Sequence, residues 1–159
     1  MRSILFLPLD KPERISKAIG SGADKVIFDL EDGLARDKKD IGRENFINFA
    51  NSNYDNQQEK FLLRINGLDT KEYHEDLKML KSISVLPFAI AIPKIESSDE
   101  CGQFLSDLGE SAKVLPQIET PKGIANIDRW DAEDIDLAGI GFGSADYTAM
   151  TGGDMDVAS

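Results

Sequence analysis

The sequence has little of several residue types that whole classes of protein need. Among its 159 residues there is one cysteine, Cys101, and one histidine, His74. One cysteine excludes an intrachain disulfide and favours a reducing, cytoplasmic compartment. One histidine excludes a histidine-rich metal site and argues against a Ser–His catalytic triad. His74 lies in the charged stretch KEYHED, so we expect its side chain to face solvent.

Positive charge and long apolar runs are also scarce. The chain has 18 Lys and Arg against 29 Asp and Glu, a formal net charge of -11. This balance opposes binding to nucleic acid, which needs a basic surface, although a local group of cations can still hold a small anion. No run approaches the roughly 20 apolar residues of a membrane span, and the N-terminal apolar run is shorter than that of a signal peptide. We therefore expect neither a nucleic-acid nor a membrane partner.

Apolar segments recur along the chain, and a segment long enough for one helix follows each of them. This βα rhythm is typical of α/β folds with a parallel sheet. No linker divides the chain, so we expect a single domain over residues 1–159. Thr70 is a predicted N-cap, and Ser97 with Glu100 a predicted capping box. The predicted strands cover residues 3–7, 25–29, 61–65, 88–92, 113–118 and 137–142, and the main helices about 39–50, 70–82 and 98–108.

About six βα units are compatible with two architectures. An open, doubly wound sheet would be complete at this length. An eight-stranded (β/α)8 barrel usually needs about 200 residues or more, so this chain would supply only part of one. The pattern alone does not choose between them.

The predicted strands each deliver a charged residue at or just after their C-terminal ends. KVIFD leads to Glu31, KFLLRI contains Arg64, KVLPQIET ends near Glu119, and LAGIGF precedes Asp146. In parallel α/β folds these strand ends meet at one edge, where ligands bind. We therefore expect these side chains to share one site.

Glu119 and Asp146 are the candidate metal ligands. A hard cation such as Mg²⁺ takes oxygen ligands and is often held by one or two carboxylates together with substrate oxygens and water. The alternative is that each carboxylate caps the helix that follows it.

Arg64 ends an otherwise apolar strand, and its planar fork suits a carboxylate or a developing enolate oxygen. The alternative is an ion pair with Glu31 or Asp32 that only supports the rim. Both can hold, because a buried arginine needs a carboxylate nearby. Strand alternation places Asp29 and Glu31 on one face and Asp32 on the other. Such close like charges indicate a neighbouring cation, although a solvated loop remains the alternative.

Two further patterns are less decisive. Lys11, Arg14 and Lys17 form a basic cluster that suits phosphates if it lies near the site, and otherwise forms an exposed helix face. The glycines of GIGFGSA, over residues 139–145, do not have the spacing of a dinucleotide-binding fingerprint.

Six motifs occur together in one order: SILFLPLDKPERISKA, GADKVIFDLEDGLARDKK, LLRINGLDT, IPKIES, LPQIETPKGIANI and GFGSADY. With them the chain resembles the citrate lyase β-subunit family and its malyl-CoA and citramalyl-CoA lyase relatives, within the HpcH/HpaI aldolase group. The resemblance covers residues 2 to about 150. It implies a (β/α)8 TIM barrel, incomplete in this chain, in a protein that assembles as trimers or hexamers.

The resemblance also implies roles for particular residues. Mg²⁺ would be held by Glu119 and Asp146, and Arg64 would contact the substrate's oxygen atoms. All three would be catalytic. The remaining substrate-binding positions divide into those that line the approach of the thioester carrier, Phe6, Lys11 and Lys17, and those that shape the site and orient the arginine, Asp29, Glu31 and Asp32.

The implied reaction is reversible carbon–carbon cleavage of a 3-hydroxyacyl thioester of the citryl or malyl type, carried on CoA or an acyl-carrier protein. The products would be a keto acid and an acetyl thioester. Two alternatives remain: a non-catalytic module that binds Mg²⁺ and a keto acid, and an aldolase acting on free keto acids. Leu9 stands where the family often has Gly, and Lys11 where Arg is common.

The resemblance further implies that a C-terminal part with strands seven and eight, and an acidic residue that acts as acid or base, is missing from this chain. We therefore expect two open sheet edges, and with them either oligomerisation or poor stability.

Overall fold

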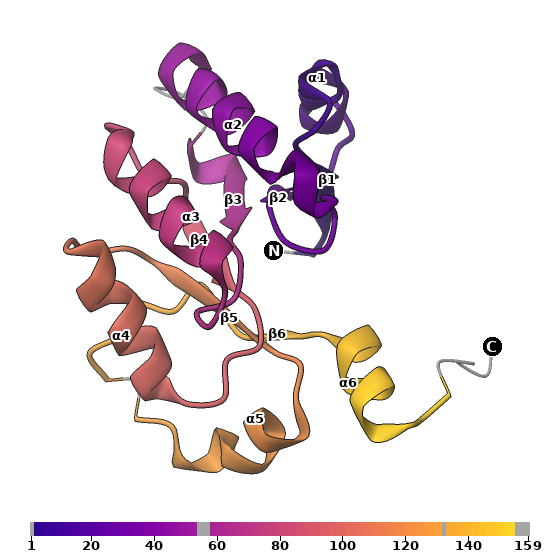
Figure 1. Cartoon of the computed structure of the whole chain (residues 1–159), viewed down its shortest axis with the longest axis vertical. Helices are drawn as coiled ribbons and strands as arrows, with labels where there is room; N and C mark the ends of the chain where they lie inside the picture. Colours follow the sequence, from indigo (N-terminus) through magenta and orange to yellow (C-terminus); the bar gives the residue numbers. More distant parts are fainter. Residues whose placement is uncertain (1, 54–57, 132, 155–159) are drawn as a thin grey trace. The chain divides into compact units, whose positions relative to one another are not determined.

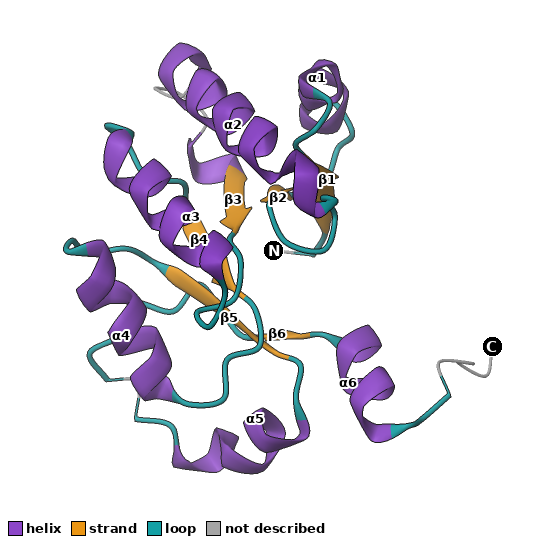
Figure 2. Ribbon diagram, viewed as in Figure 1, coloured by secondary structure: helices purple, strands orange, loops and turns teal. Residues whose placement is uncertain are grey.

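In the computed structural model, which describes residues 2–53, 58–131 and 133–154, strands and helices alternate along the chain (Figures 1 and 2). The strands are β1 (Ile4–Pro8), β2 (Lys25–Asp29), β3 (Phe61–Arg64), β4 (Ala89–Ile92), β5 (Val114–Ile118) and β6 (Gly141–Phe142). The α-helices are α1 (Ile15–Ile19), α2 (Lys39–Asn53), α3 (Lys71–Ser82), α4 (Ser98–Leu108), α5 (Pro121–Asn126) and α6 (Ser144–Thr151), and short 3₁₀ turns cover Pro12–Arg14, Arg36–Lys38, Gln58–Lys60 and Ile127–Arg129.

The chain forms two compact units, Met1–Ala91 and Ile92–Ser159. In the first unit, β1 pairs with β2, β2 with β3, and β3 with β4, all in parallel. In the second unit, β5 pairs with β6, also in parallel. Parallel neighbours require a crossover connection, and helices supply it here. The predicted βα rhythm is confirmed, while the single domain expected from the sequence stays a prediction.

The core of the first unit is a cluster of phenylalanines from β2, α2 and β3. The rings of Phe28 and Phe61 stack at 5.1 Å between centroids, and Phe49 meets Phe28 edge-on at 4.9 Å. Phe46 packs on the same ring, and it is fully buried together with Phe28 and Phe61. Burying such side chains contributes about 1.5–3 kcal/mol each. The cluster anchors α2 on the two strands whose C-terminal ends carry Asp29 and Arg64.

The last predicted strand is shorter than expected. The sequence predicts residues 137–142, but β6 has only Gly141 and Phe142. Leu137 still forms a parallel bridge with Val114. Between these two contacts Gly139 has a φ of 149°, a value that favours glycine and that interrupts the strand.

One of the two predicted helix caps is confirmed. Thr70 accepts a hydrogen bond from the backbone N–H of Tyr73 at 3.1 Å, at the start of α3. Ser97 precedes α4, but its side chain makes no capping hydrogen bond. Glu100 does reach back across the first turn, where it accepts from the N–H of Glu96 at 2.7 Å. Because a capping box needs Glu100 to accept from the N–H of Ser97 itself, the predicted capping box is wrong.

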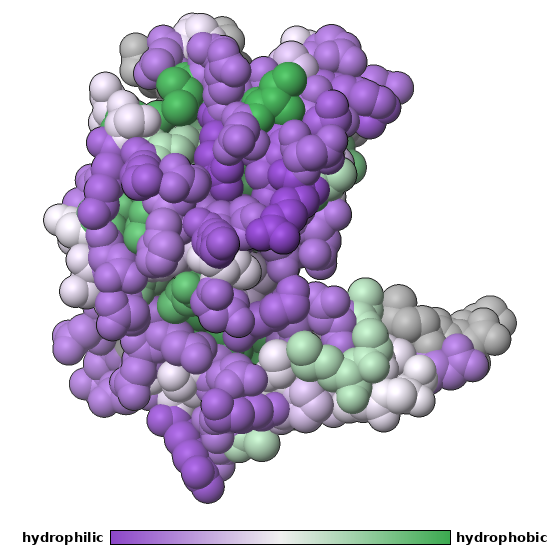
Figure 3. Space-filling model, viewed as in Figure 1, coloured by the Kyte–Doolittle hydropathy of each residue, from purple (hydrophilic) through white to green (hydrophobic). Residues whose placement is uncertain are grey.

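Hydrophilic residues cover most of the face drawn in Figure 3, and apolar residues form small groups on it. His74 is exposed, as the charged stretch around it predicts. Among the residues that the structure describes, no helix is long and apolar enough to cross a membrane.

Candidate functional site

Arg64 is held by two carboxylates from the end of the neighbouring strand. The parallel register places Arg64 directly opposite Asp29. Its Nε donates to Asp29 Oδ1 at 2.8 Å and its Nη2 to Asp29 Oδ2 at 2.6 Å, while Nη1 lies 2.8 Å from Glu31 Oε2. All three residues are buried. The two-pronged contact fixes the plane of the guanidinium, because both prongs must stay aligned.

The Asp29 carboxylate is itself fixed by the backbone of the loop after β2. It accepts hydrogen bonds from the N–H groups of Glu31 and Gly33, each at 2.9 Å. A Cβ at Gly33 would lie only 2.4 Å from Asp29 Oδ2, so a larger residue there would displace the carboxylate. The ion-pair alternative for Arg64 is thus confirmed for Glu31, whereas Asp32 is exposed. The assignment of Asp32 to substrate binding stays a prediction.

The other substrate-binding candidates of the first unit lie on its surface. Phe6 of β1 is 45% exposed, and the guanidinium carbon of Arg64 lies 5.0 Å from its ring centroid, within range of a cation–π contact. Lys11, just before the first 3₁₀ turn, and Lys17 of α1 are both exposed. Only Phe6 of these three contacts the arginine in the residues described.

In the second unit, Glu119 follows β5 and is 3% exposed. It lies against Gly143, the residue before α6: a Cβ there would come within 2.3 Å of Glu119 Cγ and 2.4 Å of Oε1. The N–H of Gly143 also donates to the carbonyl of Ile118 at 3.0 Å, which continues the β5–β6 pairing up to the carboxylate. The missing side chain at position 143 therefore makes the space that the Glu119 side chain fills.

Neither candidate metal ligand caps a helix. Thr120 caps α5, with its Oγ1 accepting from the N–H of Gly123 at 2.9 Å. Asp146 lies in the first turn of α6, where the capping residue is a glycine, and its Oδ2 lies 3.3 Å from Lys94 Nζ. The capping alternative is therefore wrong for both carboxylates.

Lys94 has an uncommon backbone conformation for a residue with a side chain. Its φ is 56°, in the left-handed region. Such strain is typical of positions where a side chain must point in a fixed direction, and here that side chain pairs with Asp146.

Residues 2–157 match the model of the HpcH/HpaI aldolase/citrate lyase family. The chain belongs to this family.

Two curated relatives show the range of its members. The citrate lyase subunit beta of Leuconostoc mesenteroides subsp. cremoris is 28% identical over 158 residues, which cover 92% of this chain and 51% of that protein. The L-malyl-CoA/beta-methylmalyl-CoA lyase of Rhodobacter capsulatus is 32% identical over 161 residues, with 95% and 50% covered. The chain thus spans about half the length of the curated relatives it matches.

Solved structures of a citrate lyase β-subunit match the fold. The Mycobacterium tuberculosis protein complexed with oxaloacetate and magnesium superposes with a TM-score of 0.80 at 29% identity, covering 98% of this chain and 64% of that one. The same organism's protein with magnesium, acetoacetate and coenzyme A gives 0.76 at 30% identity, covering 98% and 53%. The fold is therefore of the α/β TIM-barrel type, incomplete in this chain.

The carboxylates of this HpcH/HpaI chain fit a hard divalent cation. Glu119 and Asp146 present the oxygen ligands that Mg²⁺ prefers, and the Lys94 ammonium already stands beside Asp146, which shows that this position favours positive charge. Across residues 2–53, 58–131 and 133–154, no group of three or more His, Cys, Asp or Glu side chains is arranged to hold a metal. An ion here would complete its coordination with water and substrate oxygens.

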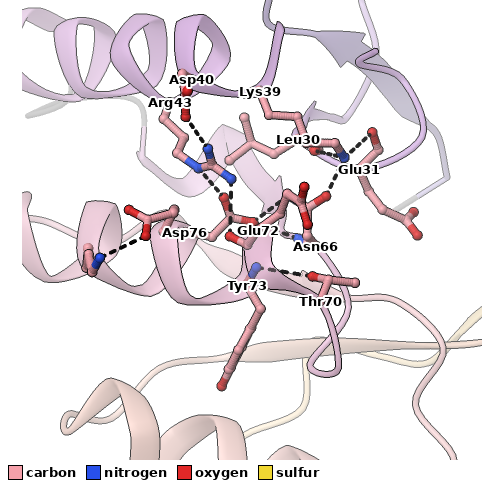
Figure 4. A network of polar contacts seen from close by, with 12 residues as sticks. Leu30, Glu31, Lys39, Asp40, Arg43, Asn66, Thr70, Glu72, Tyr73 and Asp76 are labelled. Carbon is pink, nitrogen blue, oxygen red and sulfur yellow. Dashed lines mark hydrogen bonds and ion pairs between the residues drawn. The ribbon is translucent and has the colours of Figure 1, made fainter. Parts of the chain in front are cut away.

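A buried polar network in the first unit was not predicted (Figure 4). Asp76 of α3 is fully buried and accepts from both the backbone N–H and the side-chain amide of Asn66, and from Arg43 of α2. The sequence does contain a signal: Asp76 interrupts the stripe of Tyr73, Leu77 and Leu80 that α3 buries. A charged residue in a buried stripe indicates a paired carboxylate.

Arg64 belongs to the first unit, and Glu119 and Asp146 to the second. The expectation that the three share one site stays a prediction.

Proposed function

We propose that this chain is a Mg²⁺-dependent carbon–carbon lyase acting on a 3-hydroxyacyl thioester of the citryl or malyl type. The observation that carries the proposal is the buried Glu119 carboxylate at the end of β5, lying against the glycine that begins the Asp146 helix. Support also comes from the relatives, which are named as citrate and malyl-CoA lyases, and from the neighbouring structures, which are complexes with magnesium, oxaloacetate or coenzyme A.

The residues of the second unit would hold the metal. Glu119 and Asp146 supply one or two carboxylate ligands, and the Lys94 ammonium has to leave Asp146 when a dication arrives. When bound, Mg²⁺ would lower the pKa of the substrate hydroxyl and polarise the oxygens that it contacts.

The residues of the first unit would hold the negative charge that develops as the carbon–carbon bond breaks. Arg64 provides a guanidinium that cannot lose its proton, and Asp29 with Glu31 fix its plane before the reaction begins. A donor that is already oriented stabilises a developing enolate without further reorganisation. Lys11 and Lys17 are exposed cations suited to the phosphates of the carrier, and Phe6 offers an apolar surface beside the arginine.

The test is release of acetyl-CoA from citryl-CoA and malyl-CoA by the full chain with Mg²⁺. We expect Glu119→Gln and Asp146→Asn each to reduce kcat/KM by about 100-fold or more, because each removes a charged metal ligand. Glu110→Gln, a change of the same chemistry at an exposed position, is the matched control.

The other outcomes separate the alternatives. Binding of Mg²⁺ and oxaloacetate by the folded chain, without product release, would favour a non-catalytic module. Condensation of pyruvate with an aldehyde, without dependence on CoA, would favour an aldolase. Equal activity of all three variants would refute the metal assignment.

A further inference from the structure

Four residues of α2, α3 and the loop after β3 form a connected polar bracket (Figure 4). We call Lys39, Arg43, Asn66 and Asp76 the Asp76 bracket. Asp76 Oδ2 accepts from Asn66 N and Nδ2, both at 2.7 Å, and its Oδ1 accepts from Arg43 Nε at 2.7 Å. Lys39 Nζ donates to the side-chain oxygen of Asn66. The bracket therefore joins α2 and α3 to the loop that follows β3.

The bracket contacts both chain segments that form the Arg64 ion pairs, the one that carries Arg64 and the one that carries Glu31. Asn66 is two residues after Arg64 along the chain, so it fixes the backbone on which the guanidinium is carried. Lys39 Nζ also donates to the carbonyls of Leu30 and Glu31, at 2.9 and 3.1 Å. Glu31 is one of the two carboxylates that grip the guanidinium. The Lys39 ammonium thus links the segment after Arg64, through Asn66, to the segment that carries Glu31.

Packing alone does not explain such a group. Asp76 has no exposed surface, and burying a carboxylate carries a large desolvation cost. An apolar residue at this position would stabilise the packing of α3 at least as well. Burial raises the pKa of Asp76 above its ordinary value of 3.8, although the hydrogen bonds from Asn66 and Arg43 oppose the shift. Buried ionic groups are best explained where they specify one arrangement among several.

We propose that the Asp76 bracket is a positioning device, in which Asp76, Asn66 and Lys39 set the orientation of the Arg64 guanidinium toward substrate oxygens. The inference deepens the proposed function and rests on it for the substrate. The residues of the bracket are positioning residues, because they act through Arg64 rather than on the reacting atoms.

The first experiment needs no ligand. It measures the exchange rate of the Arg64 Nε–H by NMR in the full chain, with the resonance assigned by its loss in Arg64→Lys. We expect Asn66→Ala and Lys39→Met each to speed this exchange by about 10-fold or more, since local opening exposes the N–H without global unfolding. Asp40→Asn is the control: Asp40 bonds the same Arg43 at 2.7 Å, but its side chain is 96% exposed. It should change the rate less than about 2-fold.

The second experiment measures binding of oxaloacetate in the presence of Mg²⁺ by calorimetry. Asn66→Ala should weaken binding by about 10-fold, the usual effect of losing a supporting residue. In an Arg64→Lys background the same change should have little further effect, because the group that it orients is gone. Asp76→Asn should behave in the same way if it folds, and the Asn66 variant decides the question if it does not.

Two results would overturn the bracket's role. One is that the Arg64 Nε–H exchange rate follows the loss of thermal stability in every variant, in the Asp40 control as well as in the bracket variants. The other is an effect of Asn66→Ala on binding that is fully additive with Arg64→Lys. If the wild-type chain binds no oxaloacetate, the proposed function fails, and the exchange measurement still decides whether the bracket orients the arginine.

Discussion

Replacing Gly143 with alanine adds one methyl group at the point where the Glu119 carboxylate lies. The new Cβ would be 2.3 Å from Glu119 Cγ and 2.6 Å from Cδ, whereas carbon atoms in contact are about 3.5–4.0 Å apart. The carboxylate must therefore move by about 1 Å or more. Because the clash is with a side chain, most of the adjustment falls on Glu119 rather than on the backbone.

This displacement separates an effect on the site from an effect on the fold. The overpacking should lower the free energy of unfolding by about 1–3 kcal/mol. A ligand misplaced by about 1 Å should also weaken metal binding, by about 10–100-fold, whereas a change in stability alone would leave the metal affinity of the folded chain unaltered. The assays are urea unfolding for stability and calorimetric titration with Mg²⁺ for affinity.

Gly141→Ala is the matched control, two residues earlier in β6. Its added Cβ would make an ordinary contact, with 3.4 Å to Gln117 Cγ as the shortest distance. It should leave metal affinity within about 2-fold of the wild type. The reasoning is refuted if Gly143→Ala binds Mg²⁺ as well as the control does, or if both variants lose affinity equally.

Four further predictions concern single groups. Asp29→Asn should destabilise the fold by about 3–5 kcal/mol in urea unfolding, because it leaves a buried guanidinium poorly paired; a loss of only a few tenths would contradict the buried pair. Lys94→Gly should raise the free energy of unfolding by about 1 kcal/mol by relieving the left-handed φ of 56°, and a lower melting temperature would show that the strain is not real. A hydrogen bond from Lys122 holds the pKa of Glu96 below its ordinary 4.5, and Glu96 holds the pKa of Lys122 above 10.5. The difference in free energy of unfolding between the wild type and Lys122→Met should therefore be constant between pH 4.5 and 10.5. It should fade as the pH falls through the lowered pKa of Glu96 or rises through the raised pKa of Lys122. A difference that persists in acid would refute the pairing. Burial raises the pKa of the Cys101 thiol to about 12, so it should react with Ellman's reagent far more slowly in the folded chain than in the urea-unfolded chain, and equal rates would place it at the surface.

The fold was largely predictable because hydrophobic periodicity reports local burial. β2 and β3 are buried on both faces and read as continuous apolar runs, so residues 25–29 were predicted with the bounds of β2 itself. The last strand was overestimated, because an apolar run does not reveal that a glycine within it adopts a φ of 149°. The start of α6 carries no recognisable sequence signal for a related reason: Gly143 occupies the capping position without the polar side chain by which caps are recognised.

The ion pairs of Arg64 could be predicted from the sequence, whereas the polar network around Asp76 could not. Alternation correctly placed Asp29 and Glu31 on one face, and the need of a buried arginine for a carboxylate indicated the pairing with Arg64. The Asp76 bracket was out of reach, because its members are up to 37 positions apart and their pairing depends on how two helices pack. The space at Gly143 likewise follows from strand register, which a single sequence does not show.

Two adjacent residues after β5 have separate roles: Thr120 caps the next helix, and Glu119 offers a carboxylate at the end of the strand. The Thr120 hydroxyl accepts a hydrogen bond from the N–H of Gly123 in the first turn of α5, and it donates one to the Glu96 carboxylate at 2.9 Å. The capping hydrogen bond of α5 therefore comes from Thr120 and not from Glu119. Substitutions in α5 can then change the stability of that helix while Glu119 keeps its position. The stability of the fold and the chemistry at the end of β5 can therefore change independently.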